Sequence, residues 1–167
     1  GMIIPQHPPQ SLADVLRQRR EKLAAKVPFP ALLWSGQSSS RNFPANMFPF
    51  RASSHFLYFA GSPLENAAIR LEHGKLTLFM DADSPASALW HGESPTPDAI
   101  ATQIGADAVY PLAELEKMAT GCATIPVQDR VTLTQQSHSL NRSIPPVREA
   151  ISQDRQLIQA IVALRLT

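Results

Sequence analysis

Short apolar runs that alternate with capped helical segments constrain the fold of this chain more than any other feature. Short apolar runs that end at glycine or polar residues are typical of buried strands. On this pattern, strands are predicted at residues 31–34, 56–59, 108–110 and 123–127. Runs 67–71 and 75–80 flank a turn-forming tripeptide that ends at Gly74, which predicts a hairpin with His73 as a turn residue.

Helix signals fall between these runs. Ser11 can cap a helix that ends before Pro28, and Thr96 can cap another with Pro97 at its first position. Further helices are predicted at residues 85–90, at residues 111–118 and from residue 145 onward. The first helix carries four basic residues away from its apolar side, which we interpret as a solvated face, with an acidic partner as the alternative: Arg17, Arg19, Arg20 and Lys22.

Strands that alternate with short helices indicate an α/β domain with a mixed β-sheet flanked by helices. A chain of 167 residues fits one domain, or one domain and a connecting segment. The prolines in residues 1–10 predict a flexible N-terminal tail. We expect the domain to occupy residues 11–143 and a helical segment to occupy residues 144–167.

Composition disfavours several classes of function. The formal net charge of +1 gives no broad basic surface, so no nucleic-acid partner is expected. No apolar run approaches the roughly 18 residues of a membrane helix, and the N-terminus lacks the layout of a secretion signal. A cytoplasmic protein without a membrane partner is therefore predicted. The one cysteine, Cys122, excludes an internal disulfide and is expected to be a buried thiol.

Side chains that could support catalysis are few and scattered. The histidines have no second histidine or carboxylate at the spacing of a helical metal site; they are His7, His55, His73, His91 and His138. Asp81 and Asp83 follow a strand, where α/β folds often place ligands, but a turn that leads into a helix explains them better. The sequence alone does not exclude a catalytic triad of Ser53, His55 and a distant aspartate. Such a triad would make the chain an independent small hydrolase.

Three segments together resemble one family. Residues 41–42 with 48–61 are similar to an Arg-Asn and aromatic-proline motif, and residues 78–81 leading to 89–92 are similar to a strand, an acid and a Trp-x-Gly motif. Residues 161–166 are similar to an Arg-containing junction. In order and spacing, these segments resemble the N-terminal domain of bacterial Xaa-Pro aminopeptidases, which are related to creatinase and prolidase.

The resemblance implies a creatinase/prolidase-like N-terminal domain that takes part in subunit association and helps to wall the active site. It implies a following catalytic domain in which Asp, Asp, His, Glu and Glu ligands hold two divalent ions, expected to be manganese, for hydrolysis of the bond before proline. On this interpretation the chain alone is no enzyme, with no catalytic residue, metal or cofactor of its own. Its expected partners are its catalytic domain, further copies of itself and a peptide with proline second.

Two residues of the matching segments are candidates for the wall of the substrate pocket. Arg51 follows a Phe-Pro-Phe sequence and could brace a loop or pair with a carboxylate, and an internal salt bridge is the competing interpretation. Trp90 could offer apolar area to a proline ring, and core packing is the competing interpretation.

Some residues depart from the family pattern. Glu93 and Ser94 stand where a basic residue is usual, Ala52 stands where glutamine is common, and Ile158 stands where a basic residue is expected. These differences bear on substrate preference and on whether the parent protein is an active peptidase. The alternative is a non-enzymatic peptide- or protein-binding module of the same fold, because the domain also resembles the N-terminal part of the large subunit of the FACT histone chaperone.

Overall fold

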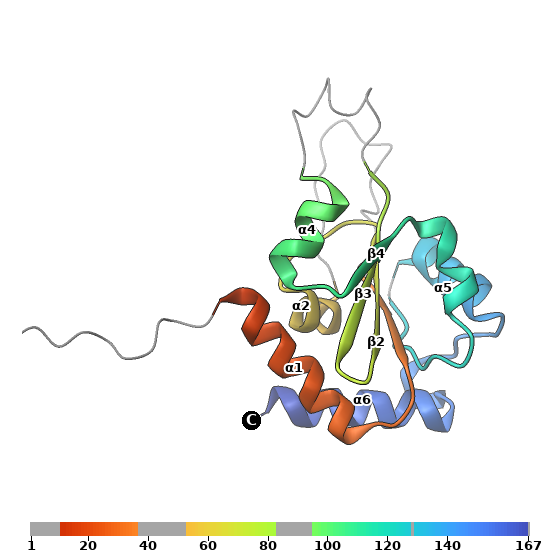
Figure 1. Ribbon diagram of the computed structural model, residues 1–167. Helices are drawn as coiled ribbons and strands as arrows, with labels where there is room; N and C mark the ends of the chain where they lie inside the picture. Colours follow the sequence, from red (N-terminus) through yellow and green to blue (C-terminus); the bar gives the residue numbers. More distant parts are fainter. Residues whose placement is uncertain (1–10, 37–52, 83–94, 128, 167) are drawn as a thin grey trace, which may run out of the picture.

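A four-stranded mixed sheet forms the centre of the molecule (Figure 1). The computed structural model describes residues 11–36, 53–82, 95–127 and 129–166. The strands lie side by side in chain order: β1 (Ala31–Trp34), β2 (Ala68–Glu72), β3 (Lys75–Phe79) and β4 (Ala108–Tyr110). β2 pairs antiparallel with both β1 and β3, whereas β3 and β4 pair in parallel. The predicted mixed sheet is therefore confirmed.

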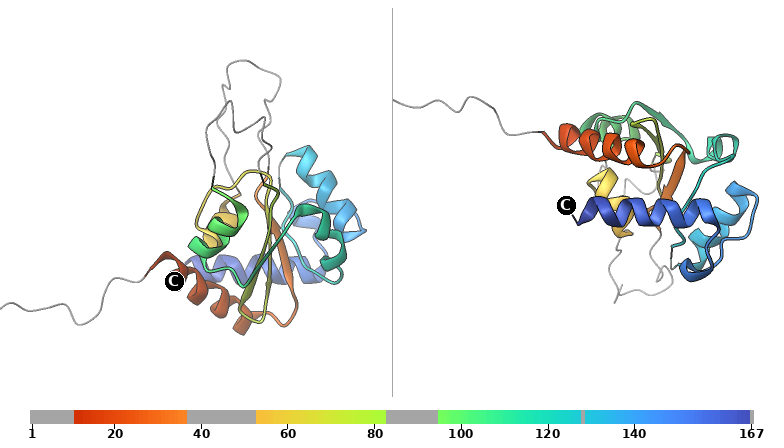
Figure 2. Two further views of the ribbon diagram at one scale, coloured as in Figure 1. Left: turned by 45° about the horizontal axis from the view of Figure 1, so that its top comes forward. Right: turned by 90° about the horizontal axis from the view of Figure 1, so that it is seen from below.

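Helical elements pack on both faces of this sheet (Figures 1 and 2). One face shares an apolar core with α1 (Leu12–Lys26), α2 (Ser54–Ala60), α4 (Pro97–Ile104) and α6 (Ser152–Arg165). The other face packs against the 3-10 turns Leu112–Glu114 and Glu116–Met118 and the end of α5 (Arg130–Leu140). A third 3-10 turn, Val147–Glu149, precedes α6. Alternation along β1 separates the two cores, since Leu33 is buried in the first and Trp34 in the second.

Local sequence signals set the ends of several elements as predicted. Ser11 Oγ and Thr96 Oγ1 each accept a hydrogen bond from the backbone N–H three residues on, at 3.2 and 3.1 Å, and so cap α1 and α4. In the β2–β3 hairpin, His73 and Gly74 have φ of 52° and 79°, because a two-residue type I′ turn requires positive φ at both positions. The assignment of His73 to the turn is confirmed.

The predicted strand at residues 56–59 is wrong, because this run is the helix α2. Ser53 Oγ accepts a hydrogen bond from Phe56 N at 3.2 Å, and Gly61 ends the helix with φ of 71°. Phe56 and Phe59, three residues apart, are both fully buried. A short apolar run carries too little periodicity to separate a buried helix from a strand, and its aromatic residues favoured the strand.

Two predictions in the following half of the chain are also corrected. The helix predicted at residues 111–118 is a pair of 3-10 turns, which are common as short connectors. Within the described residues, the strand predicted at 123–127 makes one parallel bridge to the sheet, through Ala123. The next bond of this parallel ladder would join Ile125 N to Leu32 O, but Leu32 O accepts a hydrogen bond from Thr124 Oγ1 at 2.6 Å instead.

The helix α5 has no counterpart among the predicted elements. Asp129 Oδ1 accepts a hydrogen bond from Thr132 N at 3.0 Å and caps it, and Asn141 ends it with φ of 53°. The helix predicted at residues 85–90 lies outside the described residues. None of the helices that the structure describes has the length and apolar character needed to cross a membrane.

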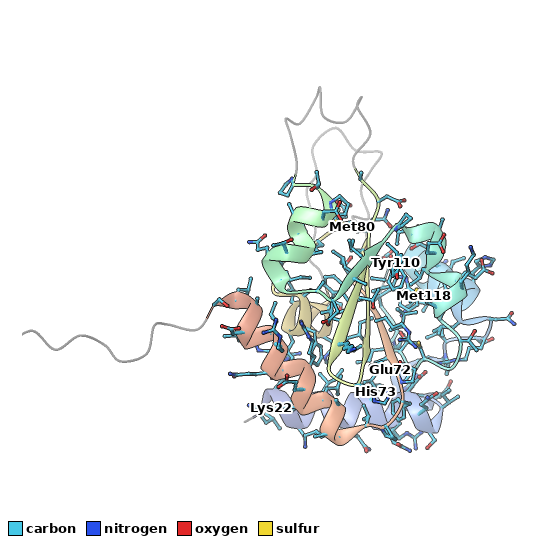
Figure 3. All side chains as sticks on the ribbon, viewed as in Figure 1. Lys22, Glu72, His73, Met80, Tyr110 and Met118 are labelled. Atoms are coloured by element: carbon cyan, nitrogen blue, oxygen red, sulfur yellow. The ribbon has the colours of Figure 1, made fainter. Side chains whose placement is uncertain are left out.

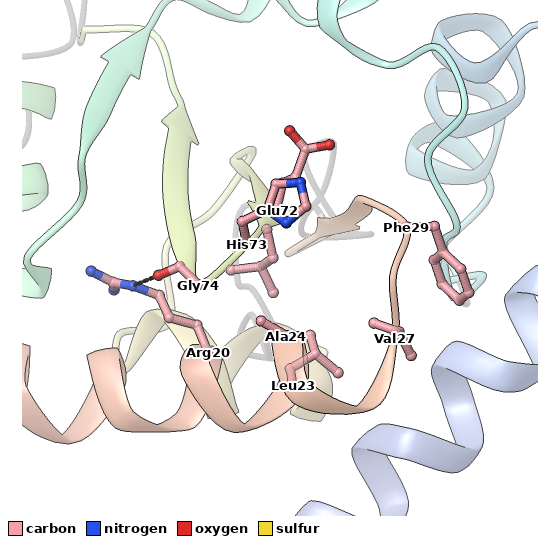
Figure 4. A pocket seen from close by; sticks show the side chains of 9 residues that line it. Arg20, Leu23, Ala24, Val27, Phe29, Glu72, His73 and Gly74 are labelled. Atoms are coloured by element: carbon pink, nitrogen blue, oxygen red, sulfur yellow. Dashed lines mark hydrogen bonds between the residues drawn. The ribbon is translucent and has the colours of Figure 1, made fainter.

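The basic side of α1 is only partly solvated, which corrects its interpretation as an exposed face. Arg20 is 2% exposed, and it donates hydrogen bonds from Nε to Gly74 O at 3.1 Å (Figure 4) and from Nη2 to Gly105 O. Burial lowers the pKa of this guanidinium, and Asp107, whose Oδ2 lies 3.8 Å from Nη2, opposes that shift. Arg20 therefore joins two turns of the fold to α1.

Candidate functional site

Three strands end at the same edge of the sheet. Because β1 and β3 are both antiparallel to β2, they run in one direction, and β4 runs parallel to β3. We call residues 34–36, 79–82 and 110–112 the strand-end edge, which lies toward the top of Figure 1. The segments 37–52 and 83–94, which lie outside the described residues, follow β1 and β3 and so begin at this edge. In α/β folds the carboxyl ends of strands are the usual place for ligand sites.

Ser35 holds together the two points at which segment 37–52 meets the fold. This residue is 1% exposed, and its Oγ accepts a hydrogen bond from Ala67 N at 3.0 Å. Its carbonyl oxygen accepts another from Ser53 N at 3.1 Å. Gly36 follows with φ of 102°, where a side chain would strain the backbone. The chain therefore leaves β1 and enters α2 at neighbouring points, joined by one hydrogen bond.

Asp81 ties together the other part of the strand-end edge. Its Oδ1 accepts a hydrogen bond from Leu112 N at 3.0 Å, so this carboxylate has a structural role between the ends of β3 and β4. The ring of Tyr110 is stacked on Phe79 with ring centroids 6.0 Å apart, and Tyr110 is 40% exposed. Figure 3 shows Tyr110 toward this edge and His73 at the opposite, hairpin end. At this edge the partly exposed ring of Tyr110 therefore covers the buried Phe79, and Asp81 joins the ends of β3 and β4.

Polar side chains join the end of α6 to the start of α2. Arg165 Nη1 donates a hydrogen bond to Ser54 Oγ at 3.1 Å and lies 3.4 Å from His55 Nδ1. Burial, followed by the charge of Arg165, lowers the pKa of His55. Ser53 is occupied as the cap of α2, and no carboxylate of the four described ranges makes an ion pair with His55. The described residues therefore do not assemble the triad that the sequence left open.

The chain matches a known family over most of its length. A sequence model described as "Aminopeptidase P, N-terminal domain" matches residues 16–126, which is more than half of the 167 residues. The chain belongs to the aminopeptidase P N-terminal domain family. The resemblance found in the three sequence segments is thereby confirmed. A search of curated proteins finds none that matches the chain.

Solved structures of aminopeptidases P have the same fold. A putative aminopeptidase P from Bacillus anthracis is 18% identical with a TM-score of 0.62, and the match covers 81% of this chain and 38% of that one. Pseudomonas aeruginosa aminopeptidase PepP is 21% identical with a TM-score of 0.62, over 75% of this chain and 31% of that one. Escherichia coli aminopeptidase P in its low-pH form is 19% identical with a TM-score of 0.59, over 95% and 34%. This domain therefore spans about a third of the length of the aminopeptidases P that it matches.

Both residues predicted to wall the substrate pocket, Arg51 and Trp90, lie outside the described residues, as does Asp83. The structure does describe where their segments attach in this aminopeptidase P domain. Arg51 belongs to the segment that Ser35 closes, and Trp90 belongs to the segment that begins after β3. Both segments therefore start at the strand-end edge.

The described residues contain no donor set for the two metal ions that the resemblance implies for a following catalytic domain. Nowhere in the four described ranges do three or more His, Cys, Asp or Glu side chains gather in a metal-binding arrangement. His138 pairs at the surface with Glu116, 3.6 Å away, and His73 lies in the hairpin turn. The described side chains thus do not fit a metal pair, and no chemical step is assigned to one in this domain.

A buried polar cluster that the sequence did not reveal holds segment 123–127 in place. Asp154 Oδ1 accepts hydrogen bonds from Thr124 N at 2.9 Å and from Arg142 Nη2 at 2.8 Å. Gln136 Nε2 donates to Thr124 Oγ1 at 3.1 Å. Side chains of α5 and α6 therefore supply the polar partners that a strand ladder would otherwise supply.

The cavities next to α1 do not resemble a substrate site. One lies between α1 and the β2–β3 hairpin (Figure 4) and has a volume of about 10 Å³, room for a single water. Its lining is Arg20, Leu23, Ala24, Val27, Phe29, Leu71, Glu72, His73 and Gly74. A groove of about 360 Å³ between the end of α1 and α6 is lined by Lys26, Val27, Gln156, Gln159, Ala160 and Ala163. Neither cavity adjoins the strand-end edge.

Proposed function

We propose that this chain is the non-catalytic N-terminal domain of a metal-dependent Xaa-Pro aminopeptidase, and that its strand-end edge forms part of the wall of the active site. The proposal rests on one observation: the segments that contain Arg51 and Trp90 begin at the same edge of the sheet in a domain of the aminopeptidase P family. The matched aminopeptidases P are about three times longer than their overlap with this chain, which leaves room for a catalytic domain.

In this proposal the work is divided between two domains. Hydrolysis of the bond before proline belongs to the following domain, with two divalent ions, proposed to be manganese. The present domain contributes substrate contacts: the Trp90 indole packs on the proline ring, and the Arg51 guanidinium braces its segment or pairs with a carboxylate. We also propose that the domain mediates homo-oligomer formation and that the enzyme is cytoplasmic.

Substitutions in the full-length protein test the wall. Removing the Trp90 ring with Trp90→Ala would lose roughly 2 kcal/mol of apolar contact. About 30-fold lower kcat/KM for Xaa-Pro peptides is then expected, mainly through KM. Val131→Ala is the matched control, because Val131 is 57% exposed on α5 and belongs to no proposed contact. If neither Trp90→Ala nor Arg51→Ala changed KM, the proposal that this domain forms part of the active-site wall would be refuted.

Three measurements test the division of labour. The 167-residue chain with added Mn²⁺ is expected not to cleave Xaa-Pro peptides, and metal analysis of the full-length protein is expected to give two ions per subunit. Light scattering of the full-length protein is expected to show an oligomer. Cleavage by the chain alone would refute the division. A full-length protein that binds these peptides without cleaving them would favour a peptide-binding module instead.

A further inference from the structure

The contact between α6 and α2 joins two parts of the chain that are far apart in sequence. Arg165, in the last turn of α6, is 111 residues from Ser54 and 110 residues from His55. Ser54 and His55 form the first turn of α2, directly after the point where Ser35 closes segment 37–52. The contact therefore fixes the end of the last helix against the element that follows the Arg51 segment.

The protonation state of His55 decides whether this contact is attractive. A guanidinium has donors and no acceptor, so Arg165 can form a hydrogen bond with Nδ1 only when that nitrogen carries no proton. The neutral ring must then hold its proton on Nε2. When the ring is doubly protonated, two cations face each other across 3.4 Å, and the hydrogen bond becomes a repulsion.

Arg165 is the charge that acts on His55. Burial, followed by Arg165, lowers the pKa of His55 from the ordinary histidine value of 6.5, so the ring is neutral at pH 7. Charged side chains on the other elements packed against α2 have partners other than His55, and Arg19 binds α2 at Tyr58, whose backbone oxygen accepts a hydrogen bond from Arg19 Nη1 at 2.8 Å. On α1, the Arg19 guanidinium lies 4.4 Å from the Tyr58 ring centroid. On β2, Arg70 and Glu72 pair with each other at 3.3 Å, and the described part of β1 carries no ionisable side chain.

We propose that Arg165, Ser54 and His55 form an acid-sensitive latch, which holds the end of α6 on α2 most firmly while His55 is neutral and weakens when His55 is protonated. Arg165 is here a positioning residue, since it touches no reacting group. Ser54 Oγ accepts a hydrogen bond from Arg165 Nη1 whether or not His55 is protonated, so acid loosens the latch rather than abolishing it. The expected loosening corresponds to one partly exposed hydrogen bond, about a 3- to 10-fold increase in local opening.

Histidine titration on the 167-residue chain tests the electrostatic half of the proposal. In NMR spectra, Arg165→Gln is expected to raise the pKa of His55 toward 6.5, whereas Arg165→Lys, which keeps the charge, should raise it less. Arg155→Gln, on the same helix but bonded to Ala150 O at 3.3 Å, is the matched control and should leave the titration of His55 unchanged. An identical His55 titration in wild type and Arg165→Gln would overturn the latch.

Hydrogen exchange tests the mechanical half. After correction for intrinsic rates, amides in the last turn of α6 should exchange about 3- to 10-fold faster at pH 5 than at pH 7.5 in the wild type. His55→Asn should abolish this pH dependence, and His138→Gln, an exposed histidine on α5, should retain it. Protection of the last turn that does not depend on pH in the wild type, or a pH dependence that survives in His55→Asn, would refute the proposal.

Discussion

Arg20 provides a sharp test of how the turns of this domain are held. Its side chain is buried, its Nε and Nη2 donate to the carbonyls of Gly74 and Gly105, and its Nη1 has no hydrogen-bond partner in the described structure. Replacement by methionine keeps much of the packing but leaves two carbonyl oxygens without donors. Replacement by alanine removes the packing as well.

The expected loss of stability follows from these contacts. Two lost hydrogen bonds to a charged donor cost about 3 kcal/mol, and removal of the unpartnered Nη1 returns about 1 to 2 kcal/mol. Arg20→Met should therefore lower the free energy of unfolding by about 1 to 2 kcal/mol. Arg20→Ala adds the loss of the buried methylenes, for a total of about 3 to 4 kcal/mol. At about 2 to 4 °C per kcal/mol for a chain of this size, the alanine variant should melt roughly 6 to 16 °C lower.

Urea unfolding followed by circular dichroism measures these differences. Arg17→Met is the matched control on the same helix, because the Arg17 side chain is 51% exposed and its ion pair with Asp14 spans 3.4 Å. That variant should change stability by less than about 0.5 kcal/mol. If Arg20→Met proved as stable as the wild type, the free energy gained by removing the buried charge would equal or exceed that lost with the two hydrogen bonds. The interpretation that Arg20 stabilises the fold by binding the two turns would then be wrong.

Four further predictions concern single groups. Ser53→Ala removes the cap of α2 and should cost about 1 kcal/mol in urea unfolding, whereas Ser53→Asp should restore most of it. Asp154→Ala leaves Thr124 N buried without a partner, so a loss of about 3 kcal/mol is expected, and a loss below 1 kcal/mol would contradict its structural role. Burial raises the pKa of the Cys122 thiol, so a thiol reagent at pH 8 should react slowly with the native protein and rapidly in urea. The pKa of His55 is lower in the folded protein than in the unfolded chain, so the stability that neutral His55 contributes is complete above pH 6.5 and falls as the pH drops below 6.5. If acidification below pH 6.5 raised the melting temperature of the wild type relative to His55→Asn, this predicted direction would be contradicted.

Features with strong local chemistry could be predicted from the sequence. Capping residues and the hairpin turn define their own backbone geometry within a few positions, so α1, α4 and the β2–β3 hairpin were predicted correctly. The prediction of a strand at residues 56–59 was wrong because four apolar residues fit a buried helix and a buried strand equally well, and tertiary packing determines which one forms. The buried state of Arg20 depends on carbonyl oxygens contributed by remote turns, which no pattern within α1 reveals.

The family was predicted from the sequence, whereas the site residues stay untested. The segments that resemble the family identified that family, and the strand directions explain why two of those segments begin at one edge of the sheet. The side-chain roles of Arg51 and Trp90 stay predictions. The contact of Arg165 with His55 had no signal in the sequence, because residues 110 positions apart show no spacing that could relate them.

The single hydrogen bond between Ser35 and Ser53 has a consequence for how proteins of this type can diverge. Because it closes the base of segment 37–52 with backbone atoms, we expect the sheet and α2 to tolerate changes in the length and composition of that segment. Insertions, deletions or whole exchanges of this stretch among related enzymes should leave the scaffold intact. Under the proposed wall function, replacing this one segment would change substrate preference without any adjustment of the core.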